Sequence, residues 1–169
     1  AQLHIPKDGL IAYYPFNNDL KDWSGNNHNG KATEALLVGT KNKACFFNGK
    51  NAFIEFSGIE ALAKVNQLSI SCWICPFAAK EYDSWISKAN DSRNNSQWRL
   101  SFGPTCANQL QLVFYNSNWK TFDADFRIEM DHWYHIVYLI DNNGHKASIY
   151  INGQKIKSAE IEEILASGG

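Results

Sequence analysis

The residues best suited to chemistry in this 169-residue chain form a polar, turn-rich segment at Asp22–Gly30. The segment combines one aspartate and one serine with three asparagines and two glycines. Ca²⁺ takes about six to eight oxygen ligands from carboxylates, amides and backbone carbonyls, and such a loop can supply several of them. The segment therefore predicts a calcium site with Asp22, Ser24 and Asn27 as ligands. The alternative is a hydrogen-bonded Asx turn that holds no metal.

A second group of polar and aromatic residues falls on two stretches that alternate with period two, Gln97–Phe102 and Leu110–Tyr115. Alternation places residues such as Trp98 and Leu112 toward a core and the residues between them outward, on a polar surface. Sugars stack their C–H faces on aromatic rings, and an aromatic platform with a few placed polar groups has the general form of a ligand site. The predicted ligand-binding residues, from this surface and the loops near it, are Trp85, Asn94, Arg99, Gln111, Tyr115 and Trp119.

The six tryptophans are divided between the core and this surface. Tryptophan in a β-sandwich mostly fills the core, so Trp73, Trp98 and Trp133 are assigned to it. Trp85 and Trp119 are expected at strand ends, where loops converge. For these two residues a core role and a ligand role both stay open.

Short strands must position these residues, because most structured stretches alternate with period two and are separated by Asn and Gly turns. Gly9–Phe16 and Leu68–Phe77 both predict strands. Asn48-Gly49 predicts a turn between two strands, and Asp141–Gly144 predicts a hairpin that a further turn at Asn152-Gly153 follows. Many short strands indicate an all-β, two-sheet antiparallel β-sandwich with little helix. The stretches with helical spacing are Ile59–Val65 and Ala159–Leu165.

Length and charge exclude several classes of protein. A chain of 169 residues falls within the roughly 100–200 residues of one domain, so a single domain over residues 1–169 is expected. Sixteen Lys and Arg against 17 Asp and Glu give a net charge of -1. This near-balance argues against a nucleic-acid-binding protein, which would need clustered positive charge. No apolar run approaches the ~20 residues that cross a bilayer, so the chain is not expected to span a membrane.

The four cysteines leave two alternatives open. An even number fits two disulfides in an oxidising compartment, but a chain of this length can also hold its core with reduced, buried thiols. Cys72 and Cys75 form a CxxC inside a strand-like stretch, without the second pair that a zinc ribbon needs. The chain begins at Ala1 without an apolar leader, so a signal peptide is expected to have been removed.

Five of these stretches resemble, in order, the blocks of laminin-G-like, concanavalin A-like jelly-roll domains. The resemblance implies a two-sheet antiparallel jelly-roll sandwich. Relatives continue past the Tyr-Ile-Asn-Gly turn into further strands, so this chain is expected to lack the last strands of the family. An uncovered sheet edge would invite pairing with a second copy, which predicts a homo-oligomer. The five blocks are Gly9–Gly30, Ala44–Phe56, Leu68–Ile74, Ile86–Lys88 and Trp133–Gly153.

The resemblance also bears on the chemistry. In related jelly rolls the residue that matches Asp22 ligates a structural calcium, with help from a carboxylate near the C-terminus. Glu129-Met130-Asp131 resembles part of the catalytic strand of glucanases with this fold, in which retaining hydrolysis needs two carboxyl groups ~5 Å apart. Trp133 or Tyr134 holds the place of the outer glutamate, and relatives have a turn at this point. Catalysis by Glu129 and Asp131 is therefore not expected.

Three functions compete. The leading hypothesis is a non-catalytic extracellular recognition domain, secreted or on the cell surface, which binds a carbohydrate or glycoprotein on a loop-rimmed sheet face. The second is an adhesion or assembly module that meets a protein partner through the same surface, with calcium only stiffening its loops. The third is a glycoside hydrolase or lyase, for which the acid pair is missing.

Overall fold

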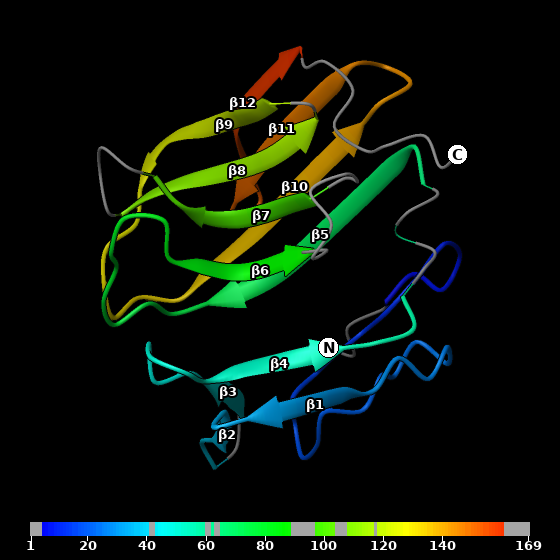
Figure 1. Ribbon diagram of the computed structural model, residues 1–169, viewed down its shortest axis with the longest axis vertical. Helices are drawn as coiled ribbons and strands as arrows, with labels where there is room; N and C mark the ends of the chain where they lie inside the picture. Colours follow the sequence, from blue (N-terminus) through cyan, green and yellow to red (C-terminus); the bar gives the residue numbers. More distant parts are fainter. Residues whose placement is uncertain are drawn as a thin grey trace. The chain divides into compact units, whose positions relative to one another are not determined.

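A computed structural model describes residues 5–40, 43–59, 62, 65–88, 97–103, 108–116 and 118–160 (Figure 1). The chain divides into two compact units, Ala1–Ala61 and Leu62–Gly169, and each is described by itself. All the strand pairs of the described residues are antiparallel, which confirms the predicted all-β class. No helix in this part of the chain is long and apolar enough to cross a membrane.

The first unit holds two two-stranded sheets. β1 (Gly30–Thr33) pairs with β4 (Phe53–Phe56), and β2 (Leu36–Val38) pairs with β3 (Ala44–Phe46). The strands predicted on either side of Asn48-Gly49 exist as β3 and β4, and each of them pairs with another strand rather than with the other of the two. Asn48 Oδ1 instead accepts hydrogen bonds from three successive backbone N–H groups, which widens the connection into a loop.

The predicted opening strand at Gly9–Phe16 is also wrong. Phe16 has a φ of 54°, in the left-handed region, and Pro15 has no N–H to donate to a ladder. The backbone of Tyr13 bonds to a loop rather than to a strand. Its N–H donates to the Asp22 carboxylate at 2.9 Å, and its carbonyl accepts from Trp23 N–H at 2.8 Å.

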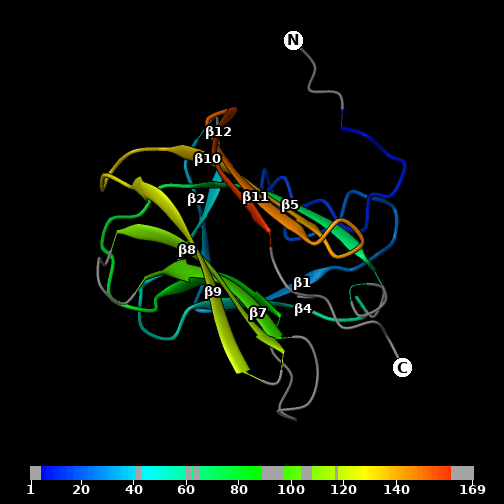
Figure 2. The same ribbon diagram turned by 90° about the horizontal axis from the view of Figure 1, so that it is seen from above.

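The second unit contains two four-stranded sheets that form two layers (Figure 2). Its strands are β5 (Gln67–Ile74), β6 (Ser84–Lys88), β7 (Gln97–Phe102), β8 (Gln109–Asn116), β9 (Asn118–Arg127), β10 (Tyr134–Asp141), β11 (Lys146–Ile151) and β12 (Gln154–Glu160). One sheet has the order β12-β11-β10-β5, and the other has the order β6-β7-β8-β9. This arrangement confirms the predicted two-sheet antiparallel sandwich.

The core of the second unit is built from the inward positions of both sheets. Leu100 and Leu112 from one sheet and Ile136 and Ile149 from the other are 0% exposed. Each occupies an alternate position of its strand, as period-two patterning requires. Burial of an aliphatic side chain of this size stabilises the fold by about 1.5–3 kcal/mol. The apolar residues of the alternating stretches are therefore what holds the two layers together.

The predicted turns of the second unit are confirmed. β10 and β11 form a hairpin in which Asp141 Oδ1 accepts a hydrogen bond from Gly144 N–H at 3.0 Å. β11 and β12 form the next hairpin through Asn152 and Gly153, whose φ angles are 50° and 80°. Positive φ at both central residues is the signature of the type I′ turn, which matches the twist of the paired strands.

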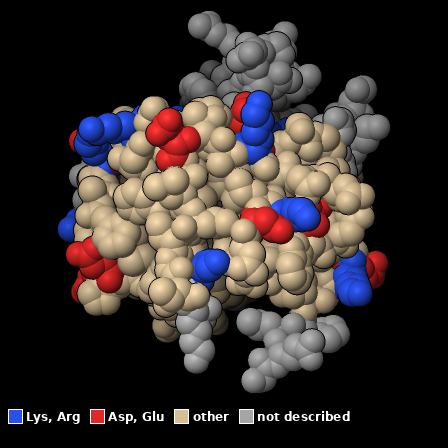
Figure 3. Space-filling view, turned by 90° about the horizontal axis from the view of Figure 1, so that it is seen from below, with Lys and Arg blue, Asp and Glu red and all other residues tan. Residues whose placement is uncertain are grey.

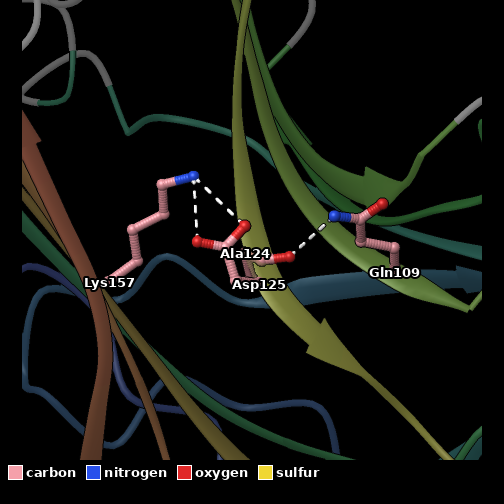
Figure 4. A network of polar contacts seen from close by, with 4 residues as sticks. All are labelled: Gln109, Ala124, Asp125 and Lys157. Atoms are coloured by element: carbon pink, nitrogen blue, oxygen red, sulfur yellow. Dashed lines mark hydrogen bonds and ion pairs between the residues drawn. The ribbon is translucent and has the colours of Figure 1, made fainter.

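β12 is the edge strand of its sheet and lies beside β9, the edge strand of the other. Lys157 on β12 reaches Asp125 on β9 at 3.4 Å, and Gln109 on β8 donates to the Ala124 carbonyl of β9 at 2.9 Å (Figure 4). Ala159 belongs to β12, so the helical spacing of Ala159–Leu165 does not begin a helix there, and residues 161–169 lie outside the described part. Pairing with a second copy stays a prediction.

Candidate functional site

The turn-rich loop of the first unit is organised around the carboxylate of Asp22, which is 8% exposed. Oδ1 accepts hydrogen bonds from the backbone N–H groups of Tyr13 at 2.9 Å and Ser24 at 2.8 Å. Oδ2 accepts from the Ser24 hydroxyl at 2.8 Å and from His28 N–H at 3.0 Å. Sequence reasoning missed Asn29, whose Oδ1 accepts from the N–H of Asp22 at 3.0 Å. One carboxylate therefore ties the opening stretch to both ends of the loop.

These hydrogen bonds set the charge state of Asp22. Burial acts to raise its pKa, but the hydrogen bonds from Tyr13, Ser24 and His28 outweigh burial and lower the pKa from 3.8 to about 2. The carboxylate is therefore ionised at neutral pH. Three N–H groups and one hydroxyl stabilise its negative charge by hydrogen bonding.

The same contacts test how the loop fits a calcium ion. A carboxylate offers about four lone-pair positions, and the four donors around Asp22 match that number. A cation at these oxygens would have to displace the N–H and O–H groups, whereas calcium needs further oxygen acceptors beside it. Ser24 lies at Asp22 as a donor, and Asn27 is exposed with a φ of 63°. The described contacts fit the metal-free turn, and calcium at this loop stays a prediction.

The predicted ligand face is the outward side of β7, β8 and β9. Cross-strand pairing places Arg99 of β7 in a row with Val113 of β8 and Thr121 of β9, and this row is the central one of three. Gln111 falls in the row on one side of it, and Tyr115 and Trp119 pair in the row on the other. The structure thus brings four of the six predicted residues into adjacent rows. The rows are Ser101, Gln111 and Asp123; Arg99, Val113 and Thr121; and Gln97, Tyr115 and Trp119.

Two polar side chains of this face have a partner nearby, and a third has none among the described residues. Gln111 is 2% exposed, and its amide donates a hydrogen bond to the Asp123 carboxylate. The Arg99 guanidinium lies 5.8 Å from the centre of the Tyr82 ring, which makes a cation–π contact. Ser101 is 0% exposed, and its hydroxyl is buried without a hydrogen-bond partner in the described part of the chain.

The expectation of an open polar surface is therefore wrong at the centre of the face. Gln111, Ser101 and Val113 all point outward by alternation but are buried. Period-two patterning assigns a side of the sheet, whereas exposure also depends on the neighbouring side chains that cover it. The accessible chemistry lies instead toward Arg99 and Tyr82, of which Tyr82 is 50% exposed.

The other predicted ligand residues are placed less directly. Trp85 on β6 is half-buried and packs against the core, with its ring centre 5.1 Å from that of Phe102. A register irregularity between Ser84 and Ile86 accompanies this position and favours the core alternative for Trp85. Asn94 lies outside the described residues. Tyr115 and Trp119 are placed by their backbone alone.

The tryptophans assigned to the core divide differently in the structure. Trp98 is 4% exposed, which confirms its assignment. Trp73 and Trp133 are 63% and 54% exposed, so a core position is wrong for both. Trp73 alternates with Cys72 and Ile74, whose side chains pack against the core, and this alternation was the signal that could have placed it outward.

The two acidic residues that resemble part of a catalytic strand do not form a catalytic pair. Glu129 and Asp131 are exposed in the turn between β9 and β10, and Asp131 has a φ of 60°. They do not share a strand face, as retaining hydrolysis would require. Among the described residues, no group of three or more His, Cys, Asp or Glu side chains could hold a metal ion.

The described cysteines are free thiols, namely Cys45, Cys72 and Cys75. This agrees with the reduced alternative rather than with two disulfides. Burial raises the pKa of Cys72 to about 12, so its thiol stays protonated at neutral pH. A protonated thiol is a poor nucleophile and a poor metal ligand, and the CxxC stretch therefore has the properties of a structural segment.

Comparison with solved structures gives the same fold over most of the chain. Domain 4 of AbnA, a GH43 extracellular arabinanase from Geobacillus stearothermophilus, in complex with arabinotriose, is 25% identical, with a TM-score of 0.72 over 94% of this chain and 79% of that one. An S-layer domain-containing protein from Clostridium thermocellum is 17% identical, with a TM-score of 0.56 over 89% and 72%. The CBM40 of the Ruminococcus gnavus IT-sialidase, bound to α2,3 sialyllactose, is 11% identical, with a TM-score of 0.54 over 82% and 73%.

Comparison of sequences adds the family. No curated protein matches the chain. The profile of the concanavalin A-like lectin/glucanases superfamily, in its laminin G form, matches residues 47–168. This match covers the whole sandwich of β5 to β12 and confirms the resemblance of the later sequence blocks. The chain therefore belongs to the concanavalin A-like lectin/glucanases superfamily.

Proposed function

We propose that this chain is a non-catalytic carbohydrate-binding domain, secreted or displayed at the cell surface, which binds a glycan on the outward side of β7, β8 and β9. The observation that carries the proposal is the Arg99–Tyr82 pair at the accessible part of that face. A guanidinium held over an aromatic ring offers donors for sugar hydroxyls or carboxylates beside a surface on which a sugar ring can stack.

The surroundings of the pair support a saccharide rather than a strongly charged ligand. Gln111 and Ser101 lie in the adjacent row and are uncharged, and the Asp123 carboxylate is engaged by Gln111. The molecule as a whole carries no large excess of either charge: its net charge is -1, and Lys, Arg, Asp and Glu side chains are interspersed on the face that Figure 3 draws. A phosphate-binding surface would require basic side chains to gather in one place.

The comparisons supply the first ligand to test. The arabinotriose-bound domain of the arabinanase shares this fold over 94% of the chain with a TM-score of 0.72. Its ligand is a neutral pentose oligosaccharide, which makes arabinotriose the probe of choice and sialyllactose an anionic contrast. The absence of catalysis is proposed because Glu129 and Asp131, the acid pair suggested by sequence, lie in an exposed turn.

Titration calorimetry with arabinotriose, linear arabinan and α2,3 sialyllactose tests the proposal. We expect saturable binding of at least one of them, weakened about tenfold or more in Arg99→Ala, because loss of an anchoring residue costs about 1.4 kcal/mol or more. Lys157→Ala is the matched control, since it removes another half-buried cation, which lies on the edge strand β12 of the other sheet. Binding that is unaffected by Arg99→Ala would refute the site. A wild-type protein silent toward all glycans that captures a protein partner would favour the adhesion module.

A further inference from the structure

The opposite sheet carries an aromatic group that the proposed function does not use. Trp73 on β5 lies directly opposite His135 on β10. The two rings are stacked, with centres 5.1 Å apart and planes at 23°. Both residues are on the outward side of their sheet, because Cys72 and Ile136, beside them in sequence, pack into the core. The stacked pair is therefore presented away from the other sheet.

His135 is fixed from several directions. Its Nε2 lies 2.8 Å from the hydroxyl oxygen of Ser71, which precedes Trp73 by two residues on the same face of β5. Its backbone N–H donates to Asn152 Oδ1 at 2.9 Å, and its carbonyl accepts from Asn152 N–H at 2.8 Å. The imidazole held in this way fixes the orientation of the indole stacked on it. A ligand that binds to Trp73 would therefore cost little additional side-chain entropy.

The exposure of Trp73 is large for so apolar a side chain. It is 63% exposed although it belongs to an ordered strand pair, where it is the last but one residue of β5. Trp133, which precedes His135 by two residues, is 54% exposed at the same end of the β5 and β10 pair. Large exposed rings held on regular structure commonly mark a binding surface.

The rim of this surface selects the chemistry of the ligand. Ser69 and Ser71 occupy the other outward positions of β5, so their hydroxyl groups lie along the strand on the same side as the indole. The imidazole and the two hydroxyls lie near the indole, and the aliphatic Val137 and Leu139 lie opposite the two serines on β10. This mixture suits a ligand with an apolar face and a hydroxylated edge, which is the chemistry of a neutral sugar ring. A protein partner would favour a broader continuous apolar patch than this stacked pair with its row of serines.

We propose that Trp73, supported by His135 and Ser71, forms a second saccharide-binding surface, with Trp133 extending it at the end of the strand pair. The exposed side of the indole stacks on the C–H face of a neutral sugar, and the Ser71 hydroxyl lies beside the sugar edge. The surface lies on the opposite sheet from Arg99 and is independent of it. One domain would then hold two polysaccharide strands, and retention on a polymer would exceed binding of a short oligosaccharide through avidity.

Affinity electrophoresis in gels that contain soluble arabinan, β-glucan or galactomannan tests this inference. We expect Trp73→Ala to lose retardation about tenfold or more in at least one of these gels, both alone and in the Arg99→Ala background. Trp23→Ala is the matched control, because Trp23 is 62% exposed but belongs to the first unit. Its retardation should equal that of the wild type.

Each other outcome overturns the second surface. Wild-type retardation of Trp73→Ala in every gel, or no retardation of the wild type in any gel, refutes it. A fall of the urea midpoint in Trp73→Ala as large as in Trp98→Ala would make Trp73 a structural residue. Loss of a wild-type dimer in sedimentation, without a change in retardation, would make the surface a protein contact. Loss of retardation in Arg99→Ala alone would support the proposed function and refute this second surface.

Discussion

Replacement of Asp22 should destabilise the first unit more than replacement of the nearby Asp19. Its two oxygens accept hydrogen bonds from the N–H groups of Tyr13, Ser24 and His28 and from the Ser24 hydroxyl. Asp22→Ala leaves all of these donors without a partner in a loop whose carboxylate is only 8% exposed. Asp22→Asn keeps one acceptor oxygen but turns an NH₂ group toward two of the donors.

The magnitude follows from the pKa of this group. A decrease from 3.8 to about 2 corresponds to about 2 kcal/mol of preference for the ionised carboxylate in the folded state. Asp22→Asn should therefore lower the free energy of unfolding by about 2 kcal/mol at pH 7. Asp22→Ala should cost more, about 3 kcal/mol, because it leaves further N–H groups unsatisfied.

The same pKa fixes the pH dependence. The folded-state pKa lies below the unfolded value, so this stabilisation is fully present above about pH 5 and is lost as the pH falls from about 4 toward 2. The difference between wild type and Asp22→Asn should be largest at neutral pH and shrink across that window. A difference that grows as the pH falls would contradict the reasoning.

Urea unfolding followed by circular dichroism, from pH 7 down to pH 2.5, measures both effects. Asp19→Asn is the matched control, because Asp19 accepts only an exposed hydrogen bond from Lys21 N–H at 3.0 Å. Its cost should stay below about 1 kcal/mol. An Asp22→Ala protein within about 0.5 kcal/mol of the wild type at pH 7 would refute the role given to the carboxylate. A melting temperature that falls with EGTA in the wild type, but not in Asp22→Ala, would instead establish the calcium site.

Three further substitutions test the packing. Gly30→Ala should lower the free energy of unfolding by about 1–3 kcal/mol, because a Cβ there would lie 2.7 Å from Phe56 Cε1 and 2.8 Å from Ile54 Cγ2. A melting temperature equal to that of the wild type would show that β1 and β4 can separate freely. Trp98→Ala should cost about 3–5 kcal/mol in urea unfolding, since the side chain is 4% exposed. Lys157→Ala should cost less than about 1 kcal/mol, because its ion pair with Asp125 at 3.4 Å is solvent-exposed, and a larger loss would mean that this pair closes the sandwich edge.

The second unit was predictable from sequence because residues close together in the chain determine its strands and turns. Alternation assigns the inward residues of β7 and β8, and Asn152-Gly153 supplies the left-handed φ angles that a two-residue hairpin requires. The first unit was less predictable because its opening stretch depends on distant partners. The N–H of Tyr13 donates a hydrogen bond to a carboxylate nine residues away. The left-handed φ of Phe16 is incompatible with the strand that the apolar opening stretch predicts.

The candidate sites show where alternation stops being informative. Alternation points Gln111 and Trp73 outward, although Trp73 was assigned to the core because it is a tryptophan. Both do point outward, yet Gln111 is 2% exposed and Trp73 is 63% exposed. The cross-strand neighbours of the two residues differ as well. Asp123 lies opposite Gln111 and binds its amide, whereas Trp73 has a stacked partner on one side and solvent on the other. Register between strands, which no single stretch encodes, therefore decides which outward residue can meet a ligand.

That distinction bears on how a sandwich of this kind acquires function. Burial of Trp98 contributes to folding, so its indole is not available for recognition, whereas the exposed indole of Trp73 is held in place by His135 without contributing a comparable buried area. A sheet edge or outward face can therefore change its ligand by changing residues that the core does not need. Because the two outward faces belong to different sheets, substitutions at Arg99 and at Trp73 should alter binding independently while both leave the core between the sheets intact.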